Sequence, residues 1–171
     1  MDSVSASALG SGIDLYRIDD QNHTDCDKLL ELAHSWGHRE VTLIGVEGDR
    51  LDHLIATLHS CAKTPVHVRL AVRDGLGHVL GPGTYRISTI PGRRISFLPL
   101  VEVSALNVTG VRWPLQAVNL SIGNFISISN LAEEPMCDIS FESGHLLVLQ
   151  EIPHDHLPIW PDQDGLAILG T

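Results

Sequence analysis

Residues 40–72, "EVTLIGVEGDRLDHLIATLHSCAKTPVHVRLAV", determine the fold that we expect for this chain. The segment "EVTLIGV" (40–46) is typical of a buried strand, and the alternating "VHVRLAV" (66–72) is typical of another strand. Between them, "LDHLIATLHSCA" (51–62) carries apolar residues at helical spacing. Two strands joined through a helix by short connections indicate a parallel αβ layer.

A further helix is expected just upstream of this unit. The segment "HTDCDKLLELAHSWG" (23–37) also places apolar residues near helical spacing. Thr24 followed by Asp27 matches a capping box, and Gly37 is typical of a helix end. We therefore assign residues 1–75 to an α/β layer, a partial parallel sheet of the Rossmann-like kind.

The second half of the chain has a different character. From residue 76 onward, glycine and proline recur between short β-rich runs, and no long segment has helical periodicity. This pattern predicts a small all-β antiparallel sandwich over residues 76–152, with the boundary near 73–78. Residues 153–171, which contain three prolines, read as a C-terminal extension. The β-rich runs are "TYRIS", "RRISFLPL", "ALNVTG", "NLSIG", "FISIS", "CDISFE" and "HLLVLQ".

Composition excludes several classes of protein. The net charge of −10 is spread over both halves of the chain, so a nucleic-acid partner, which needs a basic face, is not expected. The apolar runs are too short to span a bilayer, and we expect a soluble cytoplasmic protein without a membrane partner. Three cysteines without CxxC spacing indicate buried thiols rather than a disulfide framework or a zinc site.

Acidic clusters precede both predicted helices. They are "DDQNHTD" (19–25) and "GDRLDH" (48–53). One interpretation is helix capping, because the helix dipole favours carboxylates at a helix start. The other is a magnesium–nucleotide site, in which the carboxylates hold Mg²⁺, Arg50 binds phosphate oxygens, and nearby glycines let the backbone approach the ligand. The residues by themselves leave both readings open.

At these clusters the sequence resembles the thiamine pyrophosphokinase family. That family shows "DQDHTD" before one helix and Gly-Arg-apolar-Asp-(His/Gln) before the next, and its β domain shows "GL(K/R)(W/Y)xL", "L(S/A)xG" and "SxSN". The matching segments of this chain occur in the same order, as "DQNHTD" (20–25), "DRLDH" (49–53), "GVRWPL" (110–115), "LSIG" (120–123) and "SISN" (127–130).

The resemblance implies transfer of a pyrophosphoryl group from ATP to the hydroxyl of thiamine. It also implies a homodimer, in which each active site combines the αβ domain of one subunit with the β domain of the other. It also implies roles for individual residues. The catalytic set would be Asp25, Asp52 and Arg50, the metal ligands for Mg²⁺ would be Asp2, Asp25 and Asp52, and the substrate-binding residues would be Gln21, Thr24, Trp113, Ser127, Ser129 and Asn130.

The chain departs from the family at its beginning. Family members carry about one more αβ unit, with "ADGG" and then "GDFDS", whereas this chain opens with "MDSV" (1–4), which matches the last letters of the second motif. We expect either an internal methionine taken as a start or a truncation. The alternative function is therefore a non-catalytic thiamine-binding module that lacks the complete ATP site.

Two further alternatives follow from the residues alone. On spacing, Trp113 is more typical of a sandwich core, and Ser127, Ser129 and Asn130 are typical of ordinary strands and turns. Histidine pairs also raise the possibility of a transition-metal site, but surface histidines are the favoured interpretation. These pairs are His34 with His38, and His154 with His156.

Overall fold

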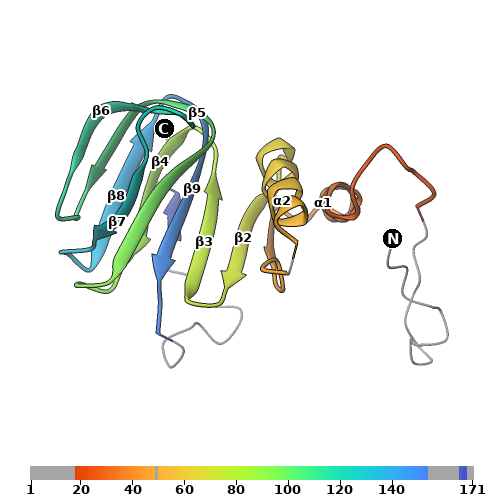
Figure 1. The fold of residues 1–171 in the computed structure, drawn as a ribbon, viewed down its shortest axis with the longest axis horizontal. Coiled ribbons are helices and arrows are strands. Elements are labelled where there is room, and N and C mark those ends of the chain that lie inside the picture. The colour runs from red at the N-terminus through yellow and green to blue at the C-terminus, as the bar shows by residue number, and fades with distance from the viewer. Residues whose placement is uncertain (1–17, 49, 154–165, 169–171) are drawn as a thin grey trace.

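The computed structural model describes residues 18–48, 50–153 and 166–168. The described chain is a mixed sheet with two helices gathered at one end (Figure 1). The elements are α1 (Asp25–Ser35), β1 (Glu40–Leu43), α2 (Leu51–Lys63), β2 (His67–Val72), β3 (Gly75–Leu80), β4 (Gly83–Ser88), β5 (Arg94–Thr109), β6 (Leu115–Leu120), β7 (Ser127–Leu131), β8 (Met136–Phe141), β9 (Ser143–Glu151) and β10 (Leu166–Ile168).

The unit β1–α2–β2 contains the parallel strand pair that the sequence predicts. Val41 pairs with Val68 and Leu43 with Leu70 in parallel register, and α2 makes the crossover between the two strands. All other pairings among the described strands are antiparallel. The sheet therefore has a short parallel edge, covered by the helices, on a larger antiparallel body.

β5 connects the two halves of this antiparallel body. The sequence suggested separate β-rich runs at 93–100 and 105–110, but the structure makes one strand of 16 residues. Its first half pairs with β9 and β7, and its second half pairs with β8 and β6. Register shifts and a positive φ of 53° at Ala105 accompany the change of partners. Such bulges bend a strand and let it pass from one sheet to another.

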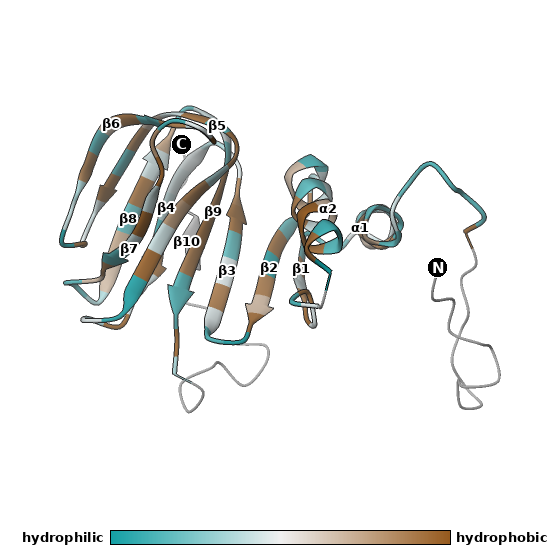
Figure 2. Ribbon diagram, viewed as in Figure 1, coloured by the Kyte–Doolittle hydropathy of each residue, from teal (hydrophilic) through white to brown (hydrophobic). Residues whose placement is uncertain are grey.

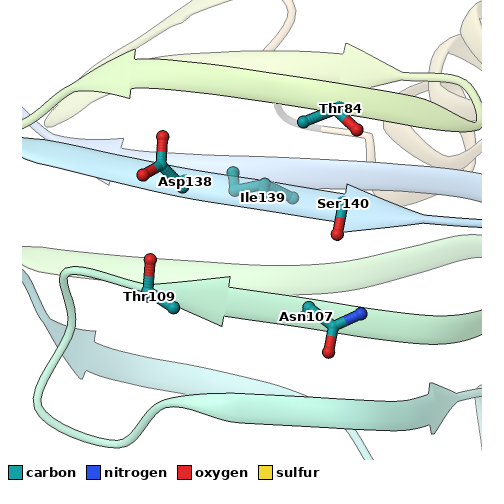
Figure 3. A pocket seen from close by; sticks show the side chains of 6 residues that line it. All are labelled: Thr84, Asn107, Thr109, Asp138, Ile139 and Ser140. Atoms are coloured by element: carbon teal, nitrogen blue, oxygen red, sulfur yellow. The ribbon is translucent and has the colours of Figure 1, made fainter. Parts of the chain in front are cut away.

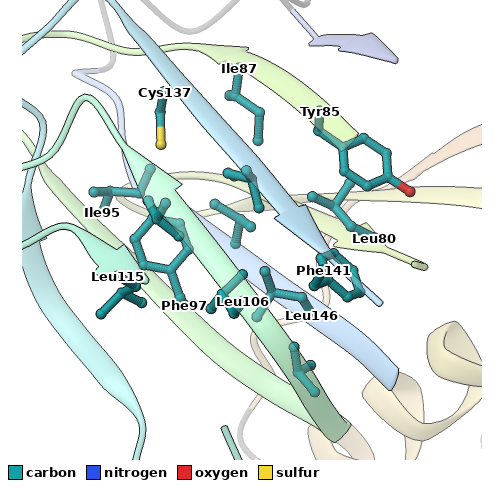
Figure 4. Packing of buried hydrophobic residues seen from close by; sticks show 14 of the residues in the cluster. Leu80, Tyr85, Ile87, Ile95, Phe97, Leu106, Leu115, Cys137, Phe141 and Leu146 are labelled. Atoms are coloured by element: carbon teal, nitrogen blue, oxygen red, sulfur yellow. The ribbon is translucent and has the colours of Figure 1, made fainter. Parts of the chain in front are cut away.

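The main hydrophobic core lies between the layers that β5 joins. Phe97, Leu106 and Leu146 are completely buried there, and Figure 4 shows them packed with side chains from β4 and β8. Figure 2 shows apolar and polar residues alternating along several of these strands, which is the pattern of a strand with one face in a core. The second half thus folds around its own apolar centre.

A smaller core holds the helices against the sheet. Leu30 of α1 and Cys61 of α2 are buried against Val68 and Leu70 of β2. The apolar faces of the helices are covered in part, since large side chains remain exposed on both helices and at the C-cap of α1. These exposed residues are Leu29, Trp36, Leu51 and Ile55.

The predicted boundary near residues 73–78 is a tight turn between paired strands. β2 and β3 are antiparallel, with Val72 opposite Gly75, and β3 in turn pairs antiparallel with β9. A Cβ at Gly75 would lie 1.9 Å from the carbonyl oxygen of Gln150, so this close pairing requires glycine. β3 is absent from the sequence prediction, because "GLGHVL" contains glycines that resemble a loop. The sheet continues through this region, and the division into domains stays a prediction.

Part of the predicted C-terminal extension takes part in the sheet. β10 pairs antiparallel with β4, with Ala167 opposite Arg86. His154 and His156 lie outside the described residues, as does Asp2. No helix within the described ranges is long and apolar enough to cross a membrane.

Candidate functional site

The start of α1 is fixed by its own capping residues. The Asp27 amide donates to Thr24 Oγ1 at 3.0 Å, and the Thr24 amide donates to Asp27 Oδ2 at 3.0 Å. This is the capping box that the sequence predicts. The segment "DQNHTD" (20–25) thus ends in a well-defined helix start.

The same turn also contacts α2, which the sequence did not reveal. Thr24 Oγ1 lies 3.1 Å from Ser60 Oγ, and Lys63 Nζ lies 3.0 Å from Asp27 Oδ1. Burial raises the pKa of Asp27, but the hydrogen bonds from Lys63, Thr24 and Ser60 outweigh it and hold that pKa well below its usual value. The first turn of α1 is therefore anchored on the second half of α2.

The loop before α1 is organised by Asp20. Its Oδ1 accepts from the Asn22 amide at 2.7 Å, and its Oδ2 lies 2.5 Å from Nδ1 of His23. The backbone hydrogen bond from Asn22 and the contact with His23 lower the pKa of Asp20, and the same contact raises the pKa of His23. Gln21 lies between these residues and is exposed, so its side chain is accessible to a ligand.

Arg50 and Asp52 form an exposed pair at the start of α2. Arg50 is the N-cap residue but makes no side-chain cap. Its Nη2 lies 2.5 Å from Asp52 Oδ2, and its Nε donates to Asp52 Oδ1 at 3.2 Å. The hydrogen bonds from Arg50 lower the pKa of Asp52, and those to Asp52 raise the pKa of Arg50. A phosphate that binds the guanidinium fork would replace this carboxylate.

Asp25 and Asp52 begin different helices and share no contact that the structure records. Asp25 is exposed and faces Lys28, with 3.4 Å between Nζ and Oδ1. Thr24, which precedes Asp25, contacts Ser60 near the end of α2. At 1.5 Å per residue, Ser60 lies about 12 Å along the helix axis from Asp52, which is at the start of α2. No group of three or more His, Cys, Asp or Glu side chains among the described residues could hold a metal ion by itself.

Trp113 lies at the surface of the β-rich half. The residue is 57% exposed, in the segment that connects β5 to β6, so it is not a core tryptophan. The Arg112 guanidinium carbon lies 5.8 Å from the centroid of the indole ring, and Arg112 Nε donates to Glu133 Oε1 at 3.0 Å. One face of the indole therefore carries a cation whose charge is balanced by Glu133.

Asn130 holds the backbone of Trp113. Its Nδ2 donates to the Trp113 carbonyl at 2.8 Å, and its Oδ1 accepts from the amides of Trp113 at 3.2 Å and Leu131 at 2.8 Å. Asn130 is 2% exposed. Because its amide is occupied by main-chain groups, Asn130 positions Trp113 here and does not itself present a surface to a ligand.

Ser127 and Ser129 lie on the same strand, β7, as Asn130. Ser127 is partly buried and Ser129 is exposed. Ser129 has a φ of 55°, which is uncommon for a residue other than glycine, and its amide donates to Ser96 Oγ at 3.0 Å. Exposed apolar side chains concentrate just before and within this strand: Ile122, Phe125, Ile126 and Ile128.

The residues expected to bind the nucleotide and those expected to bind thiamine lie toward opposite ends of the folded structure. In Figure 1 the helices stand at one end of the long axis, and β6 and β7 stand at the other. Gln21, Thr24, Asp25, Arg50 and Asp52 belong to the helical end. The structure therefore separates one set from the other, and within the helical set Asp25 and Asp52 are not in contact with each other.

A hollow of about 110 Å³ lies on the outer face of β4, β5 and β8 (Figure 3). It is lined by Thr84, Asn107, Thr109, Asp138, Ile139 and Ser140. The Asp138 carboxylate pairs with Arg86, at 2.6 Å between Oδ1 and Nε. This hollow is smaller than the several hundred Å³ that small-molecule sites usually offer, so we assign it no ligand.

Comparisons with known proteins match both halves of the chain. The family model described as "Thiamin pyrophosphokinase, catalytic domain" matches residues 1–72. The model described as "Thiamin pyrophosphokinase, vitamin B1 binding domain" matches residues 84–146. The two matches are consecutive and together cover more than half of the chain.

Individual relatives agree with these models. Thiamine pyrophosphokinase of Bacillus subtilis is 28% identical over 136 residues, which are 77% of this chain and 64% of the relative. Thiamine pyrophosphokinase 1 of Arabidopsis thaliana is 28% identical over 163 residues, 85% of this chain and 61% of the relative. The chain thus spans less than two thirds of the length of these relatives.

Solved structures show the same similarity. The crystal structure of the Bacillus subtilis thiamine pyrophosphokinase superposes with a TM-score of 0.67 at 28% identity, covering 77% of this chain and 64% of that one. The thiamin pyrophosphokinase of Geobacillus thermodenitrificans gives a TM-score of 0.65 at 27% identity, covering 81% and 66%. With its motifs, both family models and these neighbours in agreement, the chain belongs to the thiamine pyrophosphokinase family, a family of transferases.

Proposed function

We propose that this chain serves the Mg²⁺-dependent transfer of pyrophosphate from ATP to the hydroxyl of thiamine, which yields thiamine diphosphate and AMP. The observation that carries the proposal is the match of a catalytic model and a vitamin B1 binding model to consecutive parts of the chain. In such a transfer the protein contributes mainly positioning and charge stabilisation.

Trp113 is the residue that we assign to thiamine. Its indole is exposed, and a cationic thiazolium ring binds well against an aromatic face. Arg112 covers one face, so the vitamin would use the other, and Glu133 offsets the repulsion between the two cations. Ser127 and Ser129 offer hydroxyl groups on β7 to the polar parts of the ligand.

The helical end is the part that we assign to the nucleotide. Mg²⁺ in such sites is held by one or two carboxylates together with substrate phosphates and water. The exposed carboxylates of Asp25 and Asp52 fit that requirement, and when bound the ion would neutralise phosphate charge. Arg50 provides a fork for phosphate oxygens, and Gln21 provides hydrogen-bond donors. Thr24, whose amide and hydroxyl both donate to Asp27, would support the site by fixing the start of α1. Asp2, the remaining expected ligand, lies outside the described residues.

The separation of the two ends supports a homodimer. The helices and Trp113's end of the sheet stand apart in one chain, as Figure 1 shows, so a hydroxyl held at one end cannot meet a phosphate held at the other. A two-fold arrangement that brings the helical end of one subunit to the β end of its partner would form two complete sites. We place this dimer in the cytoplasm, as the sequence led us to expect.

A second candidate function is thiamine binding without turnover. It is favoured by the placement of the two expected carboxylates, because Asp25 and Asp52 begin different helices and share no contact that the structure records. Such a module would still bind thiamine at the exposed side chain of Trp113, and it would bind no nucleotide.

The two functions are separated by assays on the full 171-residue chain. Incubation with thiamine, ATP and MgCl₂, followed by chromatography of AMP and thiamine diphosphate, should show both products in equal amounts. Titration calorimetry with each ligand separately should show binding of both. Binding of thiamine alone, with no AMP formed, would identify the module, and binding of neither ligand would refute both functions.

A further inference from the structure

Two cysteines from different helices meet where α1 contacts α2. Cys26 is in the first turn of α1, and Cys61 is in the last turn of α2. The pairs Thr24–Ser60, at 3.1 Å, and Asp27–Lys63, at 3.0 Å, bracket them on both sides. Both cysteines belong to the same apolar cluster beneath the helices, and both are free thiols. Their placement follows from helix packing, and the function proposed above uses neither of them.

The two thiols differ in chemical character. Cys61 is buried at 2% exposure, whereas Cys26 is partly accessible. The two cysteine side chains are in hydrogen-bond contact with each other across the helix interface. Cys26 is thus the thiol that an oxidant in solution can reach, and Cys61 is its neighbouring partner.

We propose that Cys26 and Cys61 are a redox-sensitive pair, which hydrogen peroxide converts into a disulfide bond between α1 and α2. In the first step the Cys26 sulfur attacks one peroxide oxygen, the O–O bond breaks, and water leaves together with the thiol proton, so that Cys26 becomes a sulfenic acid. In the second step the Cys61 sulfur attacks the Cys26 sulfur, the S–O bond breaks, and a second water leaves. Two thiols are oxidised, and one peroxide is reduced to two waters.

The bond would connect the helix start that carries Thr24 and Asp25 covalently to α2. Residues 27–60 would be enclosed in a covalent loop, which restricts the unfolded chain and raises the melting temperature of the oxidised form. The third cysteine, Cys137, is completely buried in the separate core of the β-rich half. It provides an internal control, because it has the same chemistry without a neighbouring thiol in that cluster.

The test uses the full reduced chain treated with hydrogen peroxide, then denatured and alkylated. The oxidised protein should accept one alkyl group in place of three, lose about 2 Da before alkylation, and recover all three sites with dithiothreitol. Cleavage after lysine and arginine should release peptides 18–28 and 51–63 joined by a disulfide. Cys137→Ser should leave the linkage unchanged, and Cys26→Ser and Cys61→Ser should each abolish it.

An unfolded sample supplies the matched comparison. The same oxidant added in urea should give a mixture of pairings that includes Cys137, because the fold no longer selects Cys26 and Cys61. The proposal is overturned if the folded chain gives linkage between chains, linkage to Cys137, or over-oxidation of Cys26 without any joined peptide. Because the wild-type chain itself gives the readout, the test does not depend on the folding of a variant.

Discussion

Replacing Asn130 by alanine should destabilise the fold and release the Trp113 segment. The buried amide makes three hydrogen bonds, two of them to the backbone of Trp113 and one to Leu131. At about 1 kcal/mol net for each bond, the loss is about 3 kcal/mol in the free energy of unfolding. For a chain of this size such a loss lowers the melting temperature by roughly 6–12 °C.

Urea unfolding followed by circular dichroism measures this loss directly. Asn124→Ala is the matched control, because Asn124 lies in the exposed turn between β6 and β7, and its substitution should change stability by no more than about 0.5 kcal/mol. Thiamine titration at a temperature where both variants remain folded should show affinity reduced on the order of tenfold in Asn130→Ala. Equal stability of Asn130→Ala and Asn124→Ala would refute the assignment of Asn130 as the residue that holds Trp113.

Three further substitutions test separate parts of the structure. Gly75→Ala places a Cβ 1.9 Å from the Gln150 carbonyl oxygen and should cost about 2–4 kcal/mol of stability in urea unfolding, whereas Gly81→Ala, which meets open space, should cost about 0.5 kcal/mol or less; similar midpoints would contradict the β3–β9 pairing. In the folded state the pKa of Asp27 lies below its ordinary value of 3.8. The charged carboxylate therefore contributes fully to stability above pH 3.8, and this contribution is lost as the pH falls through the lower, folded pKa. The difference in unfolding free energy between wild type and Asp27→Asn should therefore be constant from neutral pH to about pH 5 and should decrease in more acidic solution. A difference that stays constant at every pH would contradict the contacts assigned to Asp27. Asp52→Asn should leave the urea midpoint nearly unchanged, since the pair with Arg50 is exposed to solvent, and should weaken binding of Mg²⁺–ATP in calorimetry; unchanged nucleotide binding would remove Asp52 from the site.

Much of the local structure was predictable because the signals are local. The helical spacing in 23–37 and 51–62, the capping box at Thr24 and the strand pattern in 66–72 all appear as expected. The parallel pairing of β1 with β2 follows from the short connections around α2. Each of these features depends on neighbours a few residues apart, which a single sequence displays.

Features that depend on distant contacts were not predictable. β3 contains glycines that look like a turn, and the reason for Gly75 is the approach of Gln150, which is 75 residues away in the chain. β5 was read as two runs, because its bulge at Ala105 interrupts the alternation by which strands are recognised. The apolar stripes of the helices indicated a core face but not how much of that face the sheet covers.

In the candidate site, too, local features could be predicted from the sequence and contacts between distant elements could not. The exposure of Trp113 was indicated by family resemblance and not by spacing, which favoured a core tryptophan. The role of Asn130 as a clamp, the anchoring of Asp27 on Lys63 and the meeting of Cys26 with Cys61 come from packing between elements. The proposed assignment of carboxylates to Mg²⁺ still rests on the family pattern, since the two carboxylates begin separate helices.

The most direct measurement of the central claim is calorimetric titration of thiamine into the wild-type chain and into Trp113→Ala. Because Trp113 is more than half exposed, its removal should leave the urea midpoint nearly unchanged. If the exposed indole receives the vitamin, wild type binds thiamine and the variant loses at least tenfold in affinity, about 1.4 kcal/mol of binding free energy. Equal affinities of the two proteins, or no heat of binding in either, would contradict the claim.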